Sequence, residues 1–555
     1  MRTEMPSSLE IAQAAVLRPI ADVAAAAGLE PDELEPYGRT KAKIDLAVLE
    51  RLRGTPDGKV VCVTAITPTS AGEGKTVTAV SLAQGFGHLG RRAVLCLREA
   101  SLGPVFGIKG GAAGGGYAQV LPMEDLNLHF TGDIHAIGAA NNLLAAMIEA
   151  HLLHGNALGI DPLTIGWRRC VDVNDRALRT TVVGLGGRAN GYPRETGFDI
   201  TAASEVMAIV AVARDLADLR ERLGSITVGY TYEGEAVLAE QLRAAGAMTV
   251  LLKEAIKPNL VQTIEGQPAL VHCGPFANTA HGNNSLVADR VALKLGEYVV
   301  TESGFGSDMG MEKFFNIICR VGDVRPSAVV LVATAKALKH HGGQPEGGLD
   351  AIERGSANLE RHLRNVSGFG LKAVVAVNRF PGDTVEEVAL VQRLALEYGA
   401  HAAEPNEAFE RGGAGAAGLA EAVADAAEQP SSFRYTYGLD EPIDAKIEAI
   451  VRQVYGADGA VFLQTARDKI ARYTRDGLDR LPICMAKTHL SLSHDPELAN
   501  APTGFDVTVR DIRAYTGAGW LVALCGTMQT MPGLGVTPAA FGVDIDEDGR
   551  TVGLF

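Results

Sequence analysis

The chain has 555 residues, and its 51 basic and 66 acidic side chains give a formal net charge of −15. This charge argues against binding nucleic acid through bulk attraction, because phosphate backbones would be repelled. A hydrophobic content of 47% excludes disorder as the main state. At about 150 residues per domain, the length fits three or four domains.

The seven cysteines are scattered along the chain, and no two of them have the CxxC spacing. Most lie inside apolar runs, so we expect reduced, buried thiols in a cytoplasmic protein. The N-terminal segment is interrupted by Arg18 and Pro19, which favours short amphipathic helices over a secretory signal. No uninterrupted apolar run approaches 18 residues, so we expect no membrane span.

Short, β-branched runs alternate with helical stretches along the first 380 residues. Most of these runs are continuously apolar, which is typical of strands buried on both faces of a parallel sheet. The expected strands are 59–66, 92–99, 126–133, 180–188, 225–231, 267–274, 297–304, 327–335 and 371–380. Intervening helical patterns, such as 202–222, predict an α/β fold with a doubly wound, mostly parallel sheet.

The later part of the chain predicts smaller additional α/β domains. Residues 385–399 and 443–455 have helical patterns, and short strands are expected around 505–510 and 520–525. We therefore divide the chain into a nucleotide-binding and catalytic domain (1–325), a second α/β domain (326–435) and a smaller C-terminal domain (436–555). Ligands bind beyond the carboxyl ends of parallel strands, where Gly-, Asn-, Asp- and Arg-rich loops indicate a large active site.

A strand, a glycine loop, a Lys-Thr pair and a helix follow one another at 59–87, which is the context of a P-loop. The predicted phosphate-binding residues are Thr69, Ser70, Ala71, Gly72, Glu73, Gly74, Lys75 and Thr76. Lys75 would reach the β- and γ-phosphates of a nucleotide, and the Thr76 hydroxyl would ligate Mg²⁺. The strict pattern has glycine where this chain has Thr69. A chance glycine turn is the alternative reading.

Three further segments are candidates for the same site. Arg98 and Glu99 end a predicted strand, and an arginine fork suits carboxylate or phosphate. The glycine-rich stretch 107–117 ends at Tyr117 and could approach a polyanion closely. Asp133 ends the expected strand 126–133, where it could orient Lys75, Mg²⁺ or an amine. A salt bridge, a surface linker and a buried turn-capping aspartate are the respective structural alternatives.

Other catalytic patterns are missing from the sequence. No HExxH occurs, and the pairs His151/His154 and His340/His341 have no obvious third ligand, so we assign these histidines structural roles. No G-x-S-x-G elbow supports a serine hydrolase.

Together the motifs resemble formate–tetrahydrofolate ligase, also called 10-formyltetrahydrofolate synthetase, over essentially the whole chain. The resemblance rests on GIKGGAAGGGYAQV, TGDIHA, NNLLAA, DVNDRALR, GPFAN and MPGL, among others. It implies that formate attacks the γ-phosphate of ATP to give formyl phosphate, and that N10 of tetrahydrofolate then takes the formyl group. It also implies a homotetramer and a monovalent cation site whose ligands we cannot place.

The resemblance assigns roles to the candidate residues. Lys75 and Mg²⁺ neutralise charge during phosphoryl transfer. Arg98 clamps formyl phosphate with Glu99 and Ser101 beside it, and Asp133 lies near N10. The residues implied for the pterin pocket are Phe380, Pro381, Phe409, Phe305 and Gly306.

The sequence departs from the family pattern at a few positions. Phe409 stands where a tryptophan usually stacks on the pterin, and it offers less area and no indole N–H. Ala335 and Lys336 replace an aliphatic residue and an arginine, and Ser70 and Ala100 replace prolines. These changes indicate a retuned folate pocket and looser loops.

Other functions remain open from the sequence. A P-loop ligase for a different small carboxylate with a non-folate acceptor would be favoured by Phe409 and Lys336. An ATP-driven switch protein would need a second lysine early in the loop, and only Lys75 is present. A catalytically inactive relative is disfavoured, because every phosphate-handling residue that we can name is present.

Overall fold

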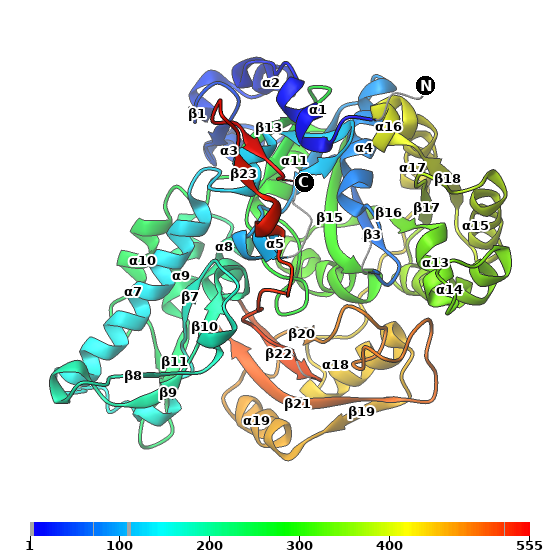
Figure 1. The fold of residues 1–555 in the computed structure, drawn as a ribbon. Coiled ribbons are helices and arrows are strands. Elements are labelled where there is room, and N and C mark those ends of the chain that lie inside the picture. The colour runs from blue at the N-terminus through cyan, green and yellow to red at the C-terminus, as the bar shows by residue number, and fades with distance from the viewer. Residues whose placement is uncertain (1–4, 70–71, 108–112, 527, 555) are drawn as a thin grey trace.

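The computed structural model describes residues 5–69, 72–107, 113–526 and 528–554. A large, mostly parallel sheet forms its centre (Figure 1). Seven strands run parallel in the spatial order β14 (Pro268–Val271), β4 (Ala93–Leu97), β15 (Tyr298–Gly306), β3 (Lys59–Ala65), β16 (Pro326–Ala333), β17 (Ala373–Asn378) and β18 (Ala402–Asn406). Beyond β14 the sheet continues with antiparallel strands. They are β13 (Asn259–Thr263), β2 (Ala42–Ile44), β1 (Leu34–Pro36), β6 (Ala118–Leu121) and β5 (Gly114–Gly115).

Both faces of the parallel strands are buried. Side chains alternate along β3, so that Val60 and Cys62 join one hydrophobic cluster while Val61 and Val63 join another. On one face pack α4 (Lys75–His88) and α17 (Ala417–Glu428). On the other lie α11 (Leu286–Leu295), α14 (Leu349–Gly368) and α15 (Val385–Glu397). The predicted mostly parallel α/β sheet is confirmed, and it runs unbroken across residue 325 because β15 and β16 both pair with β3.

A helical lobe projects from this sheet, in cyan and teal in Figure 1. Its helices are α7 (Asp133–Leu153), α8 (Glu205–Val212), α9 (Leu216–Gly224) and α10 (Ala245–Leu252). Its small sheets pair β7 (Arg169–Val171) with β10 (Phe198–Ile200), β8 (Thr181–Val183) with β9 (Arg194–Thr196), and β11 (Thr227–Tyr230) with β12 (Ala236–Leu238).

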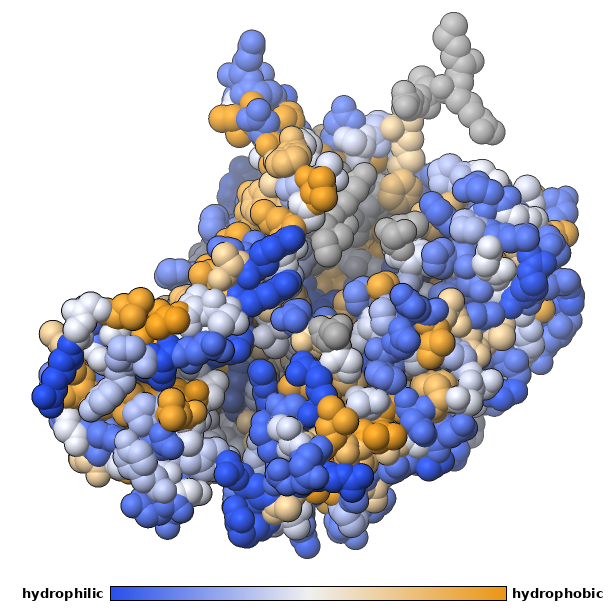
Figure 2. All heavy atoms as spheres, turned by 60° about the horizontal axis from the view of Figure 1, so that its bottom comes forward, coloured by the Kyte–Doolittle hydropathy of each residue, from blue (hydrophilic) through white to orange (hydrophobic). Residues whose placement is uncertain are grey.

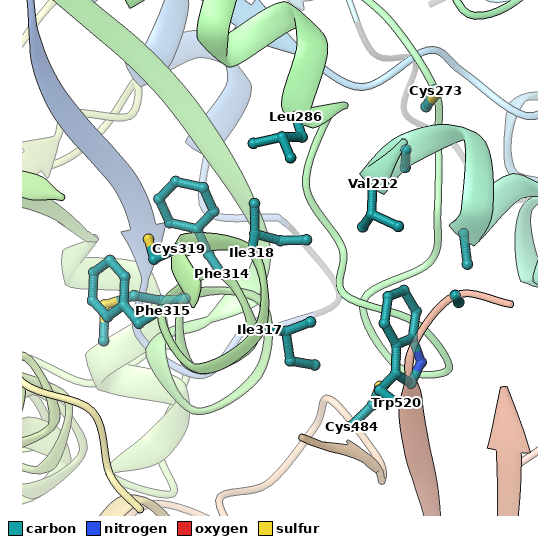
Figure 3. Close-up of a cluster of buried hydrophobic side chains, with 14 of the residues drawn as sticks. Val212, Cys273, Leu286, Phe314, Phe315, Ile317, Ile318, Cys319, Cys484 and Trp520 are labelled. Atoms are coloured by element: carbon teal, nitrogen blue, oxygen red, sulfur yellow. The ribbon is translucent and has the colours of Figure 1, made fainter. Parts of the chain in front are cut away.

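The C-terminal part forms a separate four-stranded sheet. Its order is β19 (Gly459–Phe462), β21 (Asp506–Tyr515), β22 (Trp520–Cys525) and β20 (Ile483–Ala486), with α18 (Ile443–Ile450) and α19 (Gln464–Arg475) beside it. Trp520 and Cys484 of this sheet join the same buried cluster as Ile317 of the central domain (Figure 3). The tail, with β23 (Asp544–Ile545) and β24 (Thr551–Val552), returns to the N-terminal region, where Gln13 donates to the Thr551 carbonyl.

Short helices connect these units. They are α1 (Ser8–Ala14), α2 (Ile20–Ala27), α3 (Ala47–Arg51), α5 (Leu102–Gly107), α6 (Met123–Asn127), α12 (Cys319–Gly322), α13 (Ala335–His341) and α16 (Ala408–Arg411). Helical turns of other pitch include η6 (Ser307–Met311), η7 (Phe314–Ile318), η8 (Gly412–Ala416) and η9 (Val451–Tyr455).

Several sequence predictions need correction. The expected strand 126–133 is wrong: this segment contains the end of α6 and the first residue of α7, so Asp133 begins a helix rather than ending a strand. The strands at 180–188 and 225–231 exist only as short hairpin strands outside the large sheet. The helix at 202–222 is broken into α8 and α9. Strand β18 was missed, because its sequence AAEPN lacks β-branched residues.

The other expected strands and helices are present. Strands β3, β4, β14, β15, β16 and β17 cover the six remaining predicted runs, and α15, α18, β21 and β22 match the predictions for the later segments. All seven cysteines are buried and unpaired.

Helix α7 is the one helix of the described residues that is long and apolar enough to cross a membrane by length and composition. It packs against α10 and α8, and its first residue is a buried aspartate in an ion pair. The face shown in Figure 2 is mostly hydrophilic, with separate apolar patches.

Glu205 links the helical lobe to the C-terminal sheet. Its buried carboxyl accepts hydrogen bonds from the backbone N–H groups of Gly517 (2.9 Å) and Ala518 (3.4 Å), in the turn between β21 and β22. Burial raises the pKa of Glu205 from 4.5 to about 8.

This contact predicts a pH-dependent stability. Glu205 binds its proton more tightly in the folded protein than in the unfolded chain. The stability that this proton binding adds is therefore fully present below about pH 4.5 and is lost as the pH rises through about 8. Between pH 5 and pH 8.5 the wild type should lose a few kcal/mol more stability than Glu205→Gln, at roughly 1.4 kcal/mol per pKa unit. Denaturant unfolding at the two pH values measures the difference. The exposed Glu221→Gln on α9 is the control, and an equal pH slope in all three proteins would contradict the prediction.

Candidate active site

The carboxyl ends of the parallel strands meet at one edge of the sheet and supply the candidate site. The β3–α4 loop (66–74) follows the strand near the middle of the parallel part, and Arg98 and Glu99 follow β4 on one side. On the other side Thr334 and Asn378 end β16 and β17. This arrangement is the one expected for ligand sites in open parallel sheets.

The β3–α4 loop is braced by its neighbours. One oxygen of Glu73 accepts hydrogen bonds from the backbone N–H (2.8 Å) and hydroxyl (2.9 Å) of Thr69, and the other accepts from the Thr334 hydroxyl at 2.9 Å. The Asn378 amide donates to the carbonyls of Glu73 (2.8 Å) and Gly74 (3.1 Å). Glu73 therefore supports the loop from within, while Ser70 and Ala71 lie outside the described residues.

Gly74 could not be replaced without strain. It has φ +71°, and a Cβ atom there would lie 2.7 Å from the Asn378 amide nitrogen. This tight turn delivers Lys75 and Thr76 as the first two residues of α4, where backbone N–H groups have no helical partner.

A small cavity of about 160 Å³ opens at this edge. It brings together four side chains that the sequence singled out, Thr76, Arg98, Glu99 and Ser101, and it is also lined by Glu302 of β15. Lys75 and Arg98 are electrostatic neighbours of each other and of Glu302. Desolvation lowers the pKa of Lys75 and of Arg98, and Glu302 opposes this in both cases.

Glu99 is a buried carboxyl with an unpartnered oxygen among the described residues. Burial raises its pKa well above the ordinary value, and the charge of Asp133 adds to this effect. Burial thus favours the protonated form of Glu99, and in that form its carboxyl can donate a hydrogen bond into the cavity.

Asp172 is a site residue that the sequence reasoning did not single out, although it lies in the DVNDRALR motif. Its carboxylate accepts hydrogen bonds from the Ser101 hydroxyl (2.6 Å) and from the backbone N–H of Leu102 (2.8 Å). Burial raises the pKa of Asp172 to about 6. Asp172 thus orients Ser101 at the wall of the cavity.

Asp133 is held in a buried ion pair. The Lys43 ammonium lies 2.8 and 2.9 Å from its two oxygens, and the Asn259 amide donates to one of them at 2.8 Å. Asp133 does not line the small cavity, but it acts on Glu99 electrostatically.

The aromatic candidates lie at the β17–β18 end of the edge. Phe380 follows β17 and is half-buried, Pro381 is exposed, and Phe409 in α16 is 40% exposed. Tyr117, 41% exposed, donates its backbone N–H to the Phe409 carbonyl at 2.9 Å. Two partly exposed rings therefore follow adjacent strands, and neither lines the small cavity.

The glycine-rich stretch packs against Phe409. A Cβ atom on Gly116, where φ is +56°, would lie 2.1 Å from the Phe409 carbonyl oxygen, so only glycine allows this approach. Residues 108–112 of the stretch lie outside the described residues.

Strand β15 is irregular beside the cavity. Its register with β3 shifts between Glu302 and Gly306, and Phe305 adopts a left-handed conformation with φ +60°. Such bulges and strained residues cluster at functional sites. The Phe305 ring stacks on His489 of the C-terminal part, with ring centroids 4.2 Å apart.

The segment around His489 was missed by the sequence reasoning. Burial lowers the pKa of His489 to about 4, and the charges of Lys487 and Lys75 add to this effect, so its ring is neutral at pH 7. Next to it, Lys487 forms a fully buried ion pair with Asp308 at 2.7 Å. No local sequence signal marks these contacts, because their partners are 179 and 184 positions away.

Two of the four histidines that were assigned structural roles make side-chain hydrogen bonds to the backbone. His341 donates to the Thr67 carbonyl at 2.9 Å, and His151 accepts from the Leu158 backbone N–H at 3.1 Å. Within the described ranges, no group of three or more His, Cys, Asp or Glu side chains could hold a metal ion.

Comparison with known proteins decides the family. A family model described as formate–tetrahydrofolate ligase matches residues 6–555. The chain belongs to the formate–tetrahydrofolate ligase family. It is 57% identical over 565 residues to the formate–tetrahydrofolate ligase of Desulforamulus reducens, with 100% of both chains covered. It is 54% identical to those of Symbiobacterium thermophilum and Cutibacterium acnes, with 99% of this chain and 100% of each relative covered. Members of this family are ligases that join formate to tetrahydrofolate with ATP.

In this member of the formate–tetrahydrofolate ligase family, the residues that differ from the family pattern lie in different surroundings. Ala100 is buried in the cavity wall beside Ser101. Ala335 is buried at the start of α13, whereas Lys336 is exposed and has no hydrogen bond or ion pair to any described residue. Only Ala100 of these three reaches the cavity.

The buried Asp308–Lys487 pair predicts a large cost when one partner is removed. Asp308→Asn leaves the Lys487 ammonium buried without its counter-charge, which costs about 3–5 kcal/mol. Thermal unfolding should show a lower midpoint, which the double variant Asp308→Asn/Lys487→Met partly restores. The exposed pair Arg354–Asp350 is the control, since Asp350→Asn removes only a solvent-screened ion pair and should change the midpoint far less. Equal costs for the two single variants would contradict the prediction.

Proposed function

We propose that this chain joins formate to N10 of tetrahydrofolate at the expense of ATP, through formyl phosphate. The supporting observation is the cavity of about 160 Å³ that gathers Thr76 of the glycine loop with Arg98, Glu99 and Ser101. We also propose that the β3–α4 unit is a P-loop, with residues 69–76 around the triphosphate. A strand, a tight glycine turn and a helix that begins at Lys75 favour this reading.

In the first step, a formate oxygen attacks the γ-phosphorus, the bond to the bridging oxygen breaks, and ADP leaves. Formate is a poor nucleophile, so positioning and charge neutralisation supply most of the acceleration. Lys75 neutralises the phosphate oxygens, and Arg98 holds formate and then formyl phosphate. Partial desolvation of both cations strengthens these interactions.

In the second step, N10 attacks the formyl carbon, the bond from that carbon to the phosphate oxygen breaks, and phosphate leaves with the proton that N10 gives up. In its protonated form, Glu99 donates a hydrogen bond to the formyl or phosphoryl oxygen, with Ser101 beside it. We propose that Asp133 lies near N10 and helps to manage its proton, because its carboxylate keeps acceptor capacity beyond the three hydrogen bonds that it accepts. Its charge also tunes Glu99.

Mg²⁺ fits the site through the hydroxyl of Thr76, which is free of hydrogen bonds to the described residues and lines the cavity. When bound with ATP, this ion neutralises phosphate charge. A monovalent cation is also expected, but its ligands are not assigned.

We propose that Phe380 and Phe409 stack on the two faces of the pterin, with Pro381 and Tyr117 at the rim. Phe305 and Gly306 shape the wall next to the phosphates. The rings of Phe380 and Phe409 follow adjacent strands and are accessible, which suits a flat ligand.

The remaining proposals concern the context of the enzyme. We propose that the chain is divided, as given above, into a nucleotide-binding and catalytic domain (1–325), a second α/β domain (326–435) and a smaller C-terminal domain (436–555). The first two domains would share the folate pocket. A homotetramer in the cytoplasm, without nucleic acid or membrane partners, is proposed from the family resemblance and the net charge of −15.

The direct test is ADP release with Mg-ATP, with formate and tetrahydrofolate omitted in turn. Product is read as methenyltetrahydrofolate absorbance after acidification. We expect ADP release and folate product only when both substrates are present. ATP turnover without them, or no folate product with both, would favour an ATP-driven switch or a ligase for another carboxylate.

Phe409 should determine folate affinity. Phe409→Ala removes a stacking face worth about 0.5–1.5 kcal/mol beyond its buried area, so the KM for tetrahydrofolate should rise roughly tenfold with little change in the KM for ATP. Phe409→Trp should keep or lower that KM. Phe541→Ala, at an exposed ring in the C-terminal tail, is the control. An unchanged KM for tetrahydrofolate in Phe409→Ala would remove this residue from the pocket.

A further inference from the structure

Glu302 occupies an unusual place for an acidic side chain. It lies on β15 opposite Val63 of β3, directly before the bulge that ends at Gly306, and its side chain lines the same cavity as Thr76. It is only 7% exposed. The sequence reasoning gave it no role.

The Glu302 carboxylate has no partner in the described structure. It makes no hydrogen bond or ion pair with any residue within the described ranges. Its charge nevertheless acts on Lys75 and Arg98, whose pKa values it raises. Burying a carboxylate without hydrogen bonds is costly, so such a group is retained for something that it binds.

The position of Glu302 is also unfavourable for binding a bare polyphosphate. The proposed phosphates would lie between the β3–α4 loop and Arg98, next to this carboxylate, and like charges in a partly desolvated cavity repel strongly. A divalent cation between the carboxylate and the phosphates turns this repulsion into attraction.

The available donor atoms suit magnesium. Mg²⁺ prefers oxygen ligands and is commonly held by one or two carboxylates together with substrate phosphates. In P-loop enzymes, the loop Ser or Thr is joined by an acidic residue from another strand. Here Thr76 is the second residue of the helix after β3, and Glu302 lies on the neighbouring strand β15.

The other acidic side chains near the cavity are already engaged. Glu73 accepts hydrogen bonds from Thr69 and Thr334, and Asp172 accepts from Ser101 and Leu102. Burial and the charge of Asp133 raise the pKa of Glu99 well above its ordinary value, so Glu99 is less suited than Glu302 to bind a metal ion.

We infer that Glu302 is the second protein ligand, with Thr76, of the divalent cation that accompanies ATP. This inference rests on the proposed ATP-dependent function. It adds a residue of β15 to the proposed phosphate-binding site. It also connects the bulge in β15 with metal binding, because the shift in register follows directly after Glu302.

The test compares nucleotide affinity with and without metal. Isothermal titration of ADP into the full-length protein, in EDTA and in Mn²⁺, gives the factor by which the metal tightens ADP binding. Electron paramagnetic resonance of free Mn²⁺ measures the metal directly. In Glu302→Gln we expect this factor to fall at least tenfold, while metal-free ADP binds as well as before or more tightly, because a negative charge has been removed.

Glu312→Gln is the matched control. Glu312 is also buried and accepts a hydrogen bond from Asn316, but it does not line the cavity, so the metal factor should stay at the wild-type value. If Glu302→Gln does not fold, as judged by circular dichroism, Glu302→Asp replaces it. That variant withdraws the carboxylate by one methylene and should lower the factor at least threefold.

Each outcome has a distinct meaning. An unchanged metal factor in the Glu302 variant, with normal ADP binding in the wild type, would overturn the inference and leave the proposed function standing. Altered metal-free ADP affinity with an unchanged metal factor would also overturn it, because Glu302 would then act only on Lys75 and Arg98. A wild-type protein that binds no ADP under either condition would overturn both the inference and the proposed function.

Discussion

The hydrogen bonds that brace the β3–α4 loop from neighbouring strands are the constraint on which the rest of the site depends. Glu73 and Asn378 form hydrogen bonds with polar groups inside the loop, and the Thr334 hydroxyl connects the loop to the end of β16. The described residues of the loop, 66–69 and 72–74, are held in this way, so ordering them costs little binding energy. The brace is possible only because parallel strands end at one edge, where residues 261 and 305 positions apart meet.

Burial shifts the pKa values of the ionisable groups at this edge of the sheet in different directions. Lys75 and Arg98 are partly desolvated cations without ion-pair partners among the described residues, and anions would satisfy them. Glu99 lies close by with its pKa raised well above the ordinary value, because burial and the Asp133 charge disfavour its ionised form. The site therefore combines cations, a hydrogen-bond donor and one unpartnered carboxylate within a small volume. Such a set is suited to a reaction in which charge moves between phosphate and carboxylate oxygens.

The C-terminal part contributes to the site by packing. Its segment around His489 reaches the bulge of β15, and the buried Asp308–Lys487 pair fastens this segment to the central domain. The Glu205 carboxyl joins the C-terminal sheet to the helical lobe. The shared hydrophobic cluster around Trp520 makes this attachment extensive (Figure 3). The strained backbone of Phe305 is thereby supported from a segment almost 200 residues further along the chain.

Local patterns in the sequence determined six parallel strands, the glycine loop, the Lys75–Thr76 helix start and the strand-end pair Arg98–Glu99. These features depend on neighbours within about ten residues, so periodicity and turn chemistry suffice. The motifs also identified the family, which the comparisons established. Local patterns failed at 126–133, where a short apolar run fits a helix as well as a strand, and at β18, whose residues form a strand only because β17 offers an edge.

Only the tertiary structure decided the roles of Asp172, Glu302, His489 and the Lys43–Asp133 pair. Each depends on a partner far away in the sequence, such as the β3–β15 pairing that carries Glu302 to Thr76 or the fold of the C-terminal segment over β15. A carboxylate looks the same in the sequence whether it braces a loop, neutralises a lysine or faces a cavity. Its protonation and its free lone pairs are set by burial and by neighbours that only the folded chain brings together.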